Sequence, residues 1–310
     1  MNILLFGTTG QVAQSLLPRL QTLGEVTALS RAEADFSQPE SLRAHVRACQ
    51  PDIIINAVAY TAVDRAESEA DLAHQINASA PAVLAEEAHR TDAWLIHYST
   101  DYVFDGRKAG AYVEDDPTGP INVYGRSKLA GEQAIAATGC KHLILRTSWV
   151  YSAHGQNFLK TIAKRARELP ELRVINDQFG APTSSTLIAA VTAQILPQLV
   201  RHDTGASGVY HLVAGGKTNW HDYAALILEY LRTTQPHAQM ATLTAVDSTA
   251  YQTAAARPAN SLLDTTKIRS RFGVALPDWE DEVRACLSEV CMATEIVAST
   301  PRSNRGSGSV

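Results

Sequence analysis

The sequence predicts an α/β protein with a doubly wound parallel sheet and a smaller α+β lobe. The chain opens with a short apolar run that ends at Phe6, and a glycine-rich turn and a helical pattern follow at once. Short apolar segments then alternate with helical patterns to about residue 150, which is typical of strands and helices in βαβ units. Beyond that point the alternation becomes less regular, which indicates a second lobe.

The first half of the chain is expected to form the parallel sheet and its helices. Apolar runs predict strands at residues 1–6, 26–29, 52–56, 93–98 and 142–146. Helices are expected at 15–20, at 39–48 with Pro39 in the first turn, over a long region at 66–89, and around Tyr124. Parallel strands joined in this way need right-handed crossovers, and ligands bind at the carboxyl ends of the strands.

The second half predicts a mixture of helices and short strands. Helices are expected at 156–168, 185–199, 219–233 and 279–292, and strands at 173–175 and 209–213. We therefore expect one domain at 1–150 and a second mainly at 151–297, with segments that return to the first domain. Residues 298–310 are rich in Ser, Gly and Arg, and we expect a disordered tail there.

Composition limits the classes of function. The chain has 310 residues, of which 45% are hydrophobic and 19% are charged, as in an ordinary globular protein. A net charge of −5 gives no reason to expect nucleic acid or an anionic membrane as a partner. No apolar run reaches the roughly 18 residues of a membrane span, and the start does not resemble a signal peptide.

Cysteine and histidine spacing argues against disulfides and metal ions. Four cysteines lack C-x-x-C spacing and read as reduced thiols, which predicts a cytoplasmic location. Ten histidines show no spacing typical of metal ligands, so we expect no catalytic metal.

The turn after the first strand has the pattern Gly7-x-x-Gly10-x-x-Ala13. Small residues let the backbone approach a pyrophosphate, which then lies against free N–H groups at the helix N-terminus. The pattern predicts a Rossmann-type dinucleotide site, although a strand-to-helix turn with incidental glycines is the alternative. The cofactor-binding residues expected here are Gly7, Thr9, Gly10, Gln11 and Val12.

Residues after the second and third strands are expected to contact the rest of the cofactor. Ser30 occupies the position where an acid would bind the ribose of NAD, and Arg31 suits the 2′-phosphate of NADP. A surface arginine is the alternative. Asp35 and Phe36 are expected to hydrogen-bond and pack against the adenine. The small residues Ala57, Val58 and Ala59 suit a close passage of the cofactor.

Tyr124 and Lys128 are the candidates for acid–base chemistry. Their spacing places them on one face of a helix, and a nearby ammonium lowers the pKa of a phenol. The alternative is a buried ring beside a solvated amine. Thr100 follows the fourth strand, and its hydroxyl can bond to a carbonyl oxygen beside Tyr124, although such hydroxyls are often capping groups.

Together these motifs resemble the extended short-chain dehydrogenase/reductase superfamily, and within it the dTDP-4-dehydrorhamnose reductases. Long segments carry the closer resemblance, among them Leu-Leu-Phe-Gly-Thr-Thr-Gly-Gln-Val at 4–12 and His-Tyr-Ser-Thr-Asp-Tyr-Val-Phe at 97–104. Other such segments lie at 56–64, 146–151, 174–183, 210–214 and 220–224. The resemblance covers about residues 1–290.

The resemblance implies reduction of the 4-keto group of dTDP-4-dehydro-L-rhamnose, with NADPH as the expected cofactor and NADH possible. It implies that Tyr124 donates the proton, that Lys128 holds the nicotinamide ribose and lowers the Tyr124 pKa, and that Thr100 bonds the keto oxygen. The substrate-binding residues that it implies are Val63, Thr100, Asp101, Tyr124 and Trp149, with Gln178 and Arg257 near the diphosphate.

The sequence departs from the family in two respects, at the magnesium ligands and at the cofactor position of Ser30 and Arg31, and it leaves alternatives open. Some members bind magnesium between subunits through acids, but this chain has Ser15 and Thr186 there, so we expect no magnesium-bridged dimer. Tyr102 occupies the place of the glutamate that dehydratases need. A reductase of a related 4-keto nucleotide sugar and a regulatory subunit resembling that of methionine adenosyltransferase remain alternatives. The oligomeric state stays open.

Overall fold

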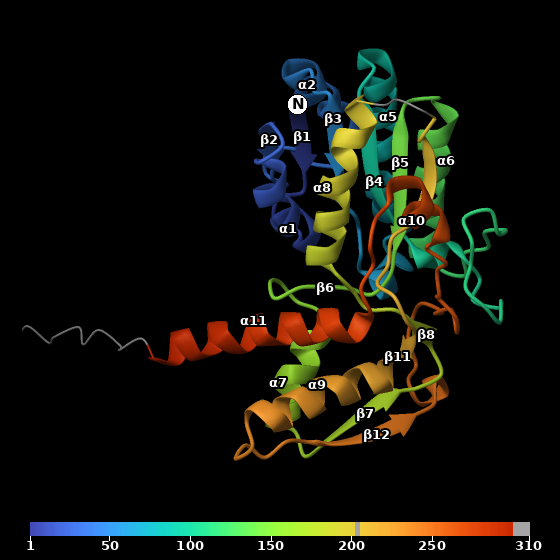
Figure 1. Ribbon diagram of the computed structural model, residues 1–310. Coiled ribbons are helices and arrows are strands. Elements are labelled where there is room, and N and C mark those ends of the chain that lie inside the picture. Colours follow the sequence, from blue (N-terminus) through green and yellow to red (C-terminus); the bar gives the residue numbers. More distant parts are fainter. Residues whose placement is uncertain (202–204, 300–310) are drawn as a thin grey trace, which may run out of the picture.

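The computed structural model describes residues 1–201 and 205–299, with side chains described to residue 200 and from 205 to 292 (Figure 1). A parallel sheet flanked by helices forms one part of the molecule. A smaller lobe lies beyond the carboxyl ends of the strands (Figure 1). From residue 300 on, the predicted tail at 298–310 lies outside the described residues.

The large sheet contains six parallel strands in the order β10-β5-β4-β3-β1-β2. The strands are β1 (Asn2–Phe6), β2 (Glu25–Leu29), β3 (Ile53–Asn56), β4 (Trp94–Thr100), β5 (His142–Thr147) and β10 (Gly208–His211). The chain order reverses between β1 and β3, and ligands bind at such a switch point. The predicted α/β fold is confirmed. The outermost strand β10 comes from the second half of the chain.

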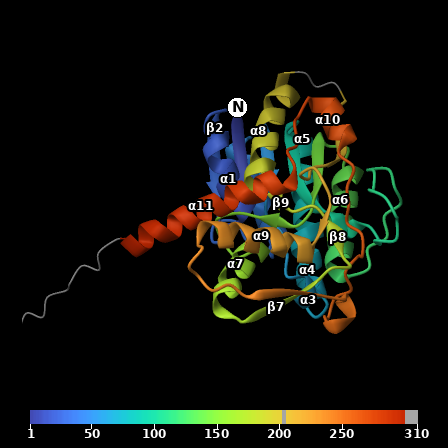
Figure 2. The same ribbon diagram turned by 60° about the horizontal axis from the view of Figure 1, so that its bottom comes forward.

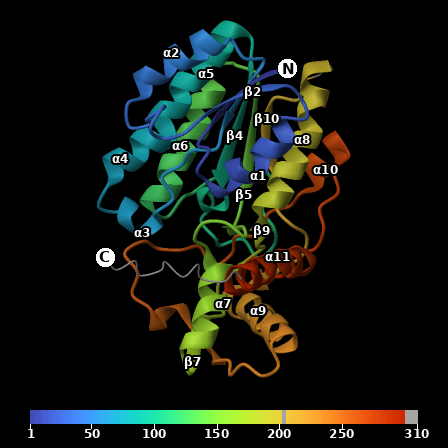
Figure 3. The same cartoon turned by 90° about the vertical axis from the view of Figure 1, so that its left-hand side faces the viewer.

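Helices cover both faces of this sheet (Figure 3). One face carries α1 (Gln11–Leu20) and α8 (Ser185–Arg201), which pack on each other. The other carries α2 (Leu42–Cys49), α5 (Ala80–Thr91) and α6 (Val123–Ala137). Strand side chains alternate between the two cores: Ile3 and Leu5 belong to one, Leu4 and Phe6 to the other.

The helical region predicted at 66–89 is broken into several pieces. It comprises α3 (Val63–Ala66), α4 (Ala70–His74), the π-helical turn η2 (Gln75–Ser79) and α5. Helix α6 approaches this turn so closely that a Cβ at Gly131 would collide with the Asn77 carbonyl oxygen. The Asn77 side chain bonds the backbone N–H and carbonyl of Tyr60, at 2.8 and 3.0 Å. The π turn therefore fixes the loop that follows β3.

The smaller lobe is built on a parallel pair of strands (Figure 1), and Figure 2 shows the long C-terminal helix beside another helix of this lobe. It contains α7 (Phe158–Glu168), β7 (Glu171–Ile175), α9 (Trp220–Thr234) and β12 (Thr242–Val246), and α11 (Trp279–Ser299) packs on α9. Strand β12 was not predicted, and α11 continues past its predicted end at 292. The remaining elements are η1 (Pro39–Ser41), η3 (Asp101–Val103), β6 (Val150–Tyr151), β8 (Phe179–Gly180), β9 (Thr183–Ser184), β11 (Thr218–Asn219), η4 (Ser248–Ala250) and α10 (Thr266–Phe272).

Candidate active site

Three adjoining cavities follow the carboxyl ends of the strands from β2 to β5. Their volumes are about 310, 380 and 320 Å³. The first and second share the Gly10 turn and the loop after β3. The second and third share residues such as Gln11, Tyr124 and Thr147. The cavities therefore form one continuous site between the sheet and the smaller lobe.

The glycine turn forms a wall of the first two cavities. Gly7 has a φ of 92°, and a Cβ there would lie 2.8 Å from Val58 Cγ2. Only glycine meets both conditions without strain. The side chain of Gln11 accepts hydrogen bonds from Ser152 and Asn157, which ties the 152–157 loop to the start of α1. Of the predicted cofactor residues, Gly7, Thr9, Gly10, Ala57, Val58 and Ala59 line the first cavity, and Gln11 and Val12 the second.

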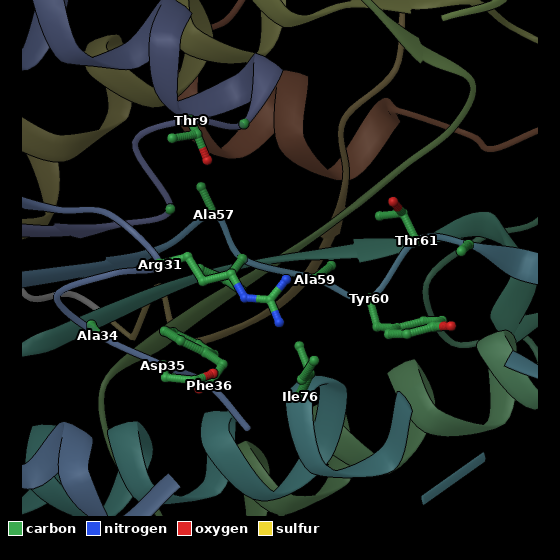
Figure 4. Close-up of a pocket in the computed structure, with 14 residues that line it drawn as sticks. Thr9, Arg31, Ala34, Asp35, Phe36, Ala57, Ala59, Tyr60, Thr61 and Ile76 are labelled. Atoms are coloured by element: carbon green, nitrogen blue, oxygen red, sulfur yellow. The ribbon is translucent and has the colours of Figure 1, made fainter. Parts of the chain in front are cut away.

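Arg31 extends across the first cavity towards Ala59 and Ile76, and Asp35 and Phe36 lie at its floor (Figure 4). The backbone N–H of Ser37 donates to Asp35 Oδ1 at 2.9 Å, which lowers the pKa of that carboxyl. Ser30 lines none of the three cavities. Its N–H and hydroxyl both donate to Glu33 Oε2, at 2.8 and 2.7 Å. An acid thus lies near the Ser30 position, which the sequence pattern did not reveal.

Two elements supply the candidate catalytic residues: Thr100 is the last residue of β4, and Tyr124 and Lys128 lie in α6. Asn122 caps α6 by accepting a bond from the Gly125 N–H at 2.7 Å. A Cβ at Gly125 would collide with the Tyr102 carbonyl oxygen, so the start of α6 lies against the segment that follows β4. Thr100 and Tyr124 both line the third cavity, and Tyr124 and Lys128 line the second. The candidate catalytic groups therefore lie where the two cavities meet.

Burial controls the proton affinity of these groups. Burial raises the pKa of Tyr124 to about 12, although the hydrogen bond with the Thr100 hydroxyl acts in the opposite direction and lowers this pKa. Burial also lowers the pKa of Lys128 to about 8, although the negative charge of Glu132 acts in the opposite direction and raises this pKa. The expected lowering of the Tyr124 pKa by Lys128 is therefore wrong for this structure, because loss of hydration dominates. A phenol that stays protonated is suited to donate a proton to a forming alkoxide.

The third cavity combines polar groups with an aromatic wall. It is lined by Val63, Asp101 and Trp149, which the sequence analysis named as candidate substrate-binding residues. Burial raises the pKa of Asp101 to about 6, although Thr100 donates to its Oδ1 at 2.9 Å. Trp149 has a φ of 47°, which is rare for a bulky residue, and its ring stacks on Trp220 with 3.7 Å between centroids.

Several lining residues were missed, and two predicted residues besides Ser30 lie elsewhere. Thr61, Ser99, Tyr102, Thr147, Ser148, Val150 and Trp220 also line the third cavity. Ser99 Oγ and Thr147 Oγ1 are buried without a hydrogen-bond partner in the described part of the chain, which suits contacts with a ligand. Their positions at the ends of β4 and β5 were the feature of the sequence that could have identified them as site residues. Gln178 and Arg257 line none of the three cavities. Arg257 pairs with Asp64, with 2.6 Å between Nη2 and Oδ2.

Comparison with known proteins identifies the family. The family described as "RmlD substrate binding domain" matches residues 1–292. The dTDP-4-dehydrorhamnose reductase of Shigella flexneri is 48% identical over 300 residues, which cover 96% of this chain and 100% of that protein. The chain belongs to the dTDP-4-dehydrorhamnose reductase family. The resemblance seen in the motifs is thus confirmed.

Other members of the dTDP-4-dehydrorhamnose reductase family agree in sequence and fold. The reductase of Burkholderia thailandensis is 44% identical over 295 residues, covering 94% of this chain and 99% of the relative. The crystal structure of a Clostridium acetobutylicum member has a TM-score of 0.86 at 29% identity, covering 94% of this chain and 100% of that one. A Bacillus anthracis reductase solved with NADP has a TM-score of 0.83 at 32% identity, covering 93% and 98%.

Proposed function

We propose that the protein is an NADPH-dependent dTDP-4-dehydrorhamnose reductase, which reduces the 4-keto group of dTDP-4-dehydro-L-rhamnose to give dTDP-L-rhamnose. This is the last step of dTDP-rhamnose synthesis, for cell-surface polysaccharide. The observation that carries the proposal is the meeting of Thr100, Tyr124 and Lys128 at the junction of two cavities, in a chain of this family.

The residues of the first two cavities fit a dinucleotide. Gly7 leaves open the space that a Cβ would fill, and Gly10 precedes α1, whose N-terminal N–H groups suit a pyrophosphate. Arg31 supplies a cation for a 2′-phosphate at the adenosine end. Bound NADPH supplies the hydride for the sugar C4. Lys128 lies along the second cavity, where a nicotinamide ribose would be held.

The chain's own groups handle the keto oxygen. Thr100 and Tyr124 line the cavity together, so both hydroxyls can donate to that oxygen. As negative charge develops there, Tyr124 transfers its phenolic proton to the oxygen. The stacked Trp149 and Trp220 rings offer an apolar wall for the sugar nucleotide, and the buried surroundings exclude water.

Arg31→Ala should weaken NADPH binding by about tenfold or more and leave NADH binding nearly unchanged. The expected size follows from the roughly 1.5–3 kcal/mol of a hydrogen bond to a charged group. Fluorescence titration with each cofactor measures both affinities. Arg107→Ala, at an arginine whose side chain is 87% exposed, is the matched control. An equal loss for both cofactors would show that Arg31 does not contact the 2′-phosphate.

Gly180→Ala should raise the KM for the sugar nucleotide by about tenfold, on the scale of the 1–3 kcal/mol that overpacking costs. A Cβ at Gly180 would lie 2.7 Å from Trp149 Cε2, so the indole must move out of its stack on Trp220. Steady-state kinetics with saturating NADPH gives the KM. Gly110→Ala is the control, because a Cβ there meets no atom within 4 Å. An unchanged KM would mean that Trp149 does not bind the substrate.

The chain should not form a magnesium-bridged dimer. Ser15 Oγ lies 2.7 Å from Ser185 Oγ, so two hydroxyls meet where α1 and α8 touch. Within the described residues no cluster of three or more His, Cys, Asp or Glu side chains could hold a metal ion. Light scattering should give the same mass with added Mg²⁺ and with a chelator. A mass that doubles with Mg²⁺ would contradict this.

The function is tested by the loss of NADPH absorbance with dTDP-4-dehydro-L-rhamnose. Turnover that yields dTDP-L-rhamnose supports the proposal. Turnover only with another 4-keto nucleotide sugar would assign a different substrate. Binding of NADPH without turnover of any of these substrates, together with co-purification of a partner enzyme, would favour a regulatory subunit.

No described helix is long and apolar enough to cross a membrane.

A further inference from the structure

A buried histidine lies directly behind Lys128 and has no role in the mechanism above. His97 is in β4, is fully buried, and pairs in register with Asn56 of β3. Its Nδ1 lies 3.0 Å from Asn56 Nδ2, and its Nε2 lies 3.0 Å from Lys128 Nζ. A continuous chain of polar contacts therefore connects the middle of the sheet to the catalytic lysine.

The backbone sets the direction of these hydrogen bonds. The N–H of Val58 donates to Asn56 Oδ1 at 3.0 Å, so the amide group of Asn56 must turn its Nδ2 towards His97. Nδ1 of His97 is then an acceptor, and a neutral imidazole carries its single proton on Nε2. Burial holds the pKa of His97 well below its usual value, so the ring is neutral. The Nε2–H group consequently points at Lys128.

Lys128 completes the pattern. Its Nζ donates to the Tyr98 carbonyl oxygen at 2.6 Å. An ammonium has no lone pair and cannot accept a bond from Nε2–H, whereas a neutral amine can. We propose that His97 is a positioning residue of the active site: its Nε2–H donates to Lys128 when that side chain is a neutral amine, and so favours the neutral amine over the ammonium that holds the cofactor.

The contact makes the direction of Lys128 depend on its charge. When the amine takes up a proton, two N–H donors face each other across the His97 contact, and the ammonium turns away from His97 towards the cavity. The other titratable groups near it are Tyr124, one turn back on α6, and Glu132, one turn on. The carboxylate of Glu132 is paired with Arg146 of β5 at 2.6 Å. Glu132 thus favours the ammonium form of Lys128, whereas His97 favours the neutral amine.

The tautomer of His97 can be read without any activity. In ¹⁵N-histidine-labelled protein, long-range ¹H–¹⁵N correlation spectra should show a protonated Nε2 and an unprotonated Nδ1 for His97. The signal is assigned by its loss in His97→Asn. A protonated Nδ1, or a doubly protonated ring at neutral pH, would overturn the proposal. Because this result does not depend on the substrate, it separates the inference from the proposed function, on which the role of Lys128 rests.

A pair of variants tests the effect on Lys128. The amide of His97→Gln reaches the Nε2 position and can offer Lys128 an acceptor. The shorter amide of His97→Asn keeps the contact with Asn56 but does not reach Lys128, so that Lys128 gains no acceptor. NADPH affinity should fall as pH rises past the Lys128 pKa, because the ammonium favours the anionic cofactor. In His97→Gln that fall should move to higher pH by about one unit or more, and in His97→Asn by less.

Thermal unfolding of both variants excludes a general loss of structure. A folded His97→Gln protein whose NADPH affinity keeps the wild-type pH dependence would show that His97 is only a packing residue. Equal shifts in both variants would also overturn the proposal, because the acceptor at the Nε2 position would then have no specific effect.

Discussion

Tyr124→Phe should lower kcat by about two decades or more, on the scale of losing a general acid. The variant removes only the phenolic oxygen, and the ring keeps its edge-to-face contact with Tyr102 at 5.8 Å. Binding of NADPH and of the sugar nucleotide should change little. The measurement is single-turnover reduction of dTDP-4-dehydro-L-rhamnose with saturating NADPH, so that product release does not hide the chemical step.

Tyr98→Phe provides the matched control. Tyr98 also lines the second cavity, but its hydroxyl lies 2.8 Å from the buried Thr192 hydroxyl and is engaged there. Its backbone carbonyl, which accepts the Lys128 bond, is unaffected by the change. Wild-type kcat is expected. If Tyr124→Phe kept more than about a tenth of the wild-type kcat, well above the loss expected for a general acid, another group would have to supply the proton.

The pH dependence gives a further check on the same residue. Because burial raises the pKa of Tyr124 to about 12, the phenol stays protonated through the neutral range. The loss of activity at alkaline pH should therefore follow Lys128, whose pKa is lowered to about 8.

Glu132→Gln should lower the free energy of unfolding by about 3–5 kcal/mol, the range for removing one partner of a buried ion pair. Glu132 and Arg146 each have 4% of the side chain exposed. Arg146 Nη2 donates to Glu132 Oε2 at 2.6 Å and its Nε to Oε1 at 3.0 Å. Without the carboxylate, the guanidinium keeps its charge in a buried place. Urea unfolding followed by circular dichroism measures the change.

An exposed pair serves as the comparison. Lys164 and Glu168 lie 3.8 Å apart on α7, with 73% and 54% of their side chains exposed. Glu168→Gln should leave the urea midpoint almost unchanged, because solvent screens such pairs. Equal effects of the two substitutions would mean that the Glu132–Arg146 pair contributes no more than a surface contact.

Local patterns were sufficient to place much of the site. The turn from Gly7 to Ala13 and the spacing of Tyr124 and Lys128 depend on the chain within a few residues. The order of strands and helices predicted where these segments meet, because parallel strands bring their carboxyl ends to one edge of the sheet. Thr100 and Tyr124 line one cavity at that edge. Such features follow from backbone geometry and are visible before any tertiary contact is known.

Other features depend on contacts between distant segments. Trp220 reaches Trp149 through the folding of the smaller lobe, and β12 was missed because only its pairing with β7 identifies it. The pKa of Tyr124 depends on how deeply the ring is buried, which spacing along a helix does not report. Glu33 approaches Ser30 through a turn that the sequence pattern did not indicate.

The late position of β10 in the chain has a consequence during synthesis on the ribosome. Every other strand of the large sheet emerges before β10, and α8, which covers α1, also emerges late. Until then, β5 has an outer edge with unpaired N–H and carbonyl groups, and part of one apolar face lacks its cover. Open edges of this kind pair readily with other chains. The nascent chain is therefore expected to be most open to self-association before residue 211 has left the exit tunnel, and a fragment that ends near residue 150 would keep that open edge permanently.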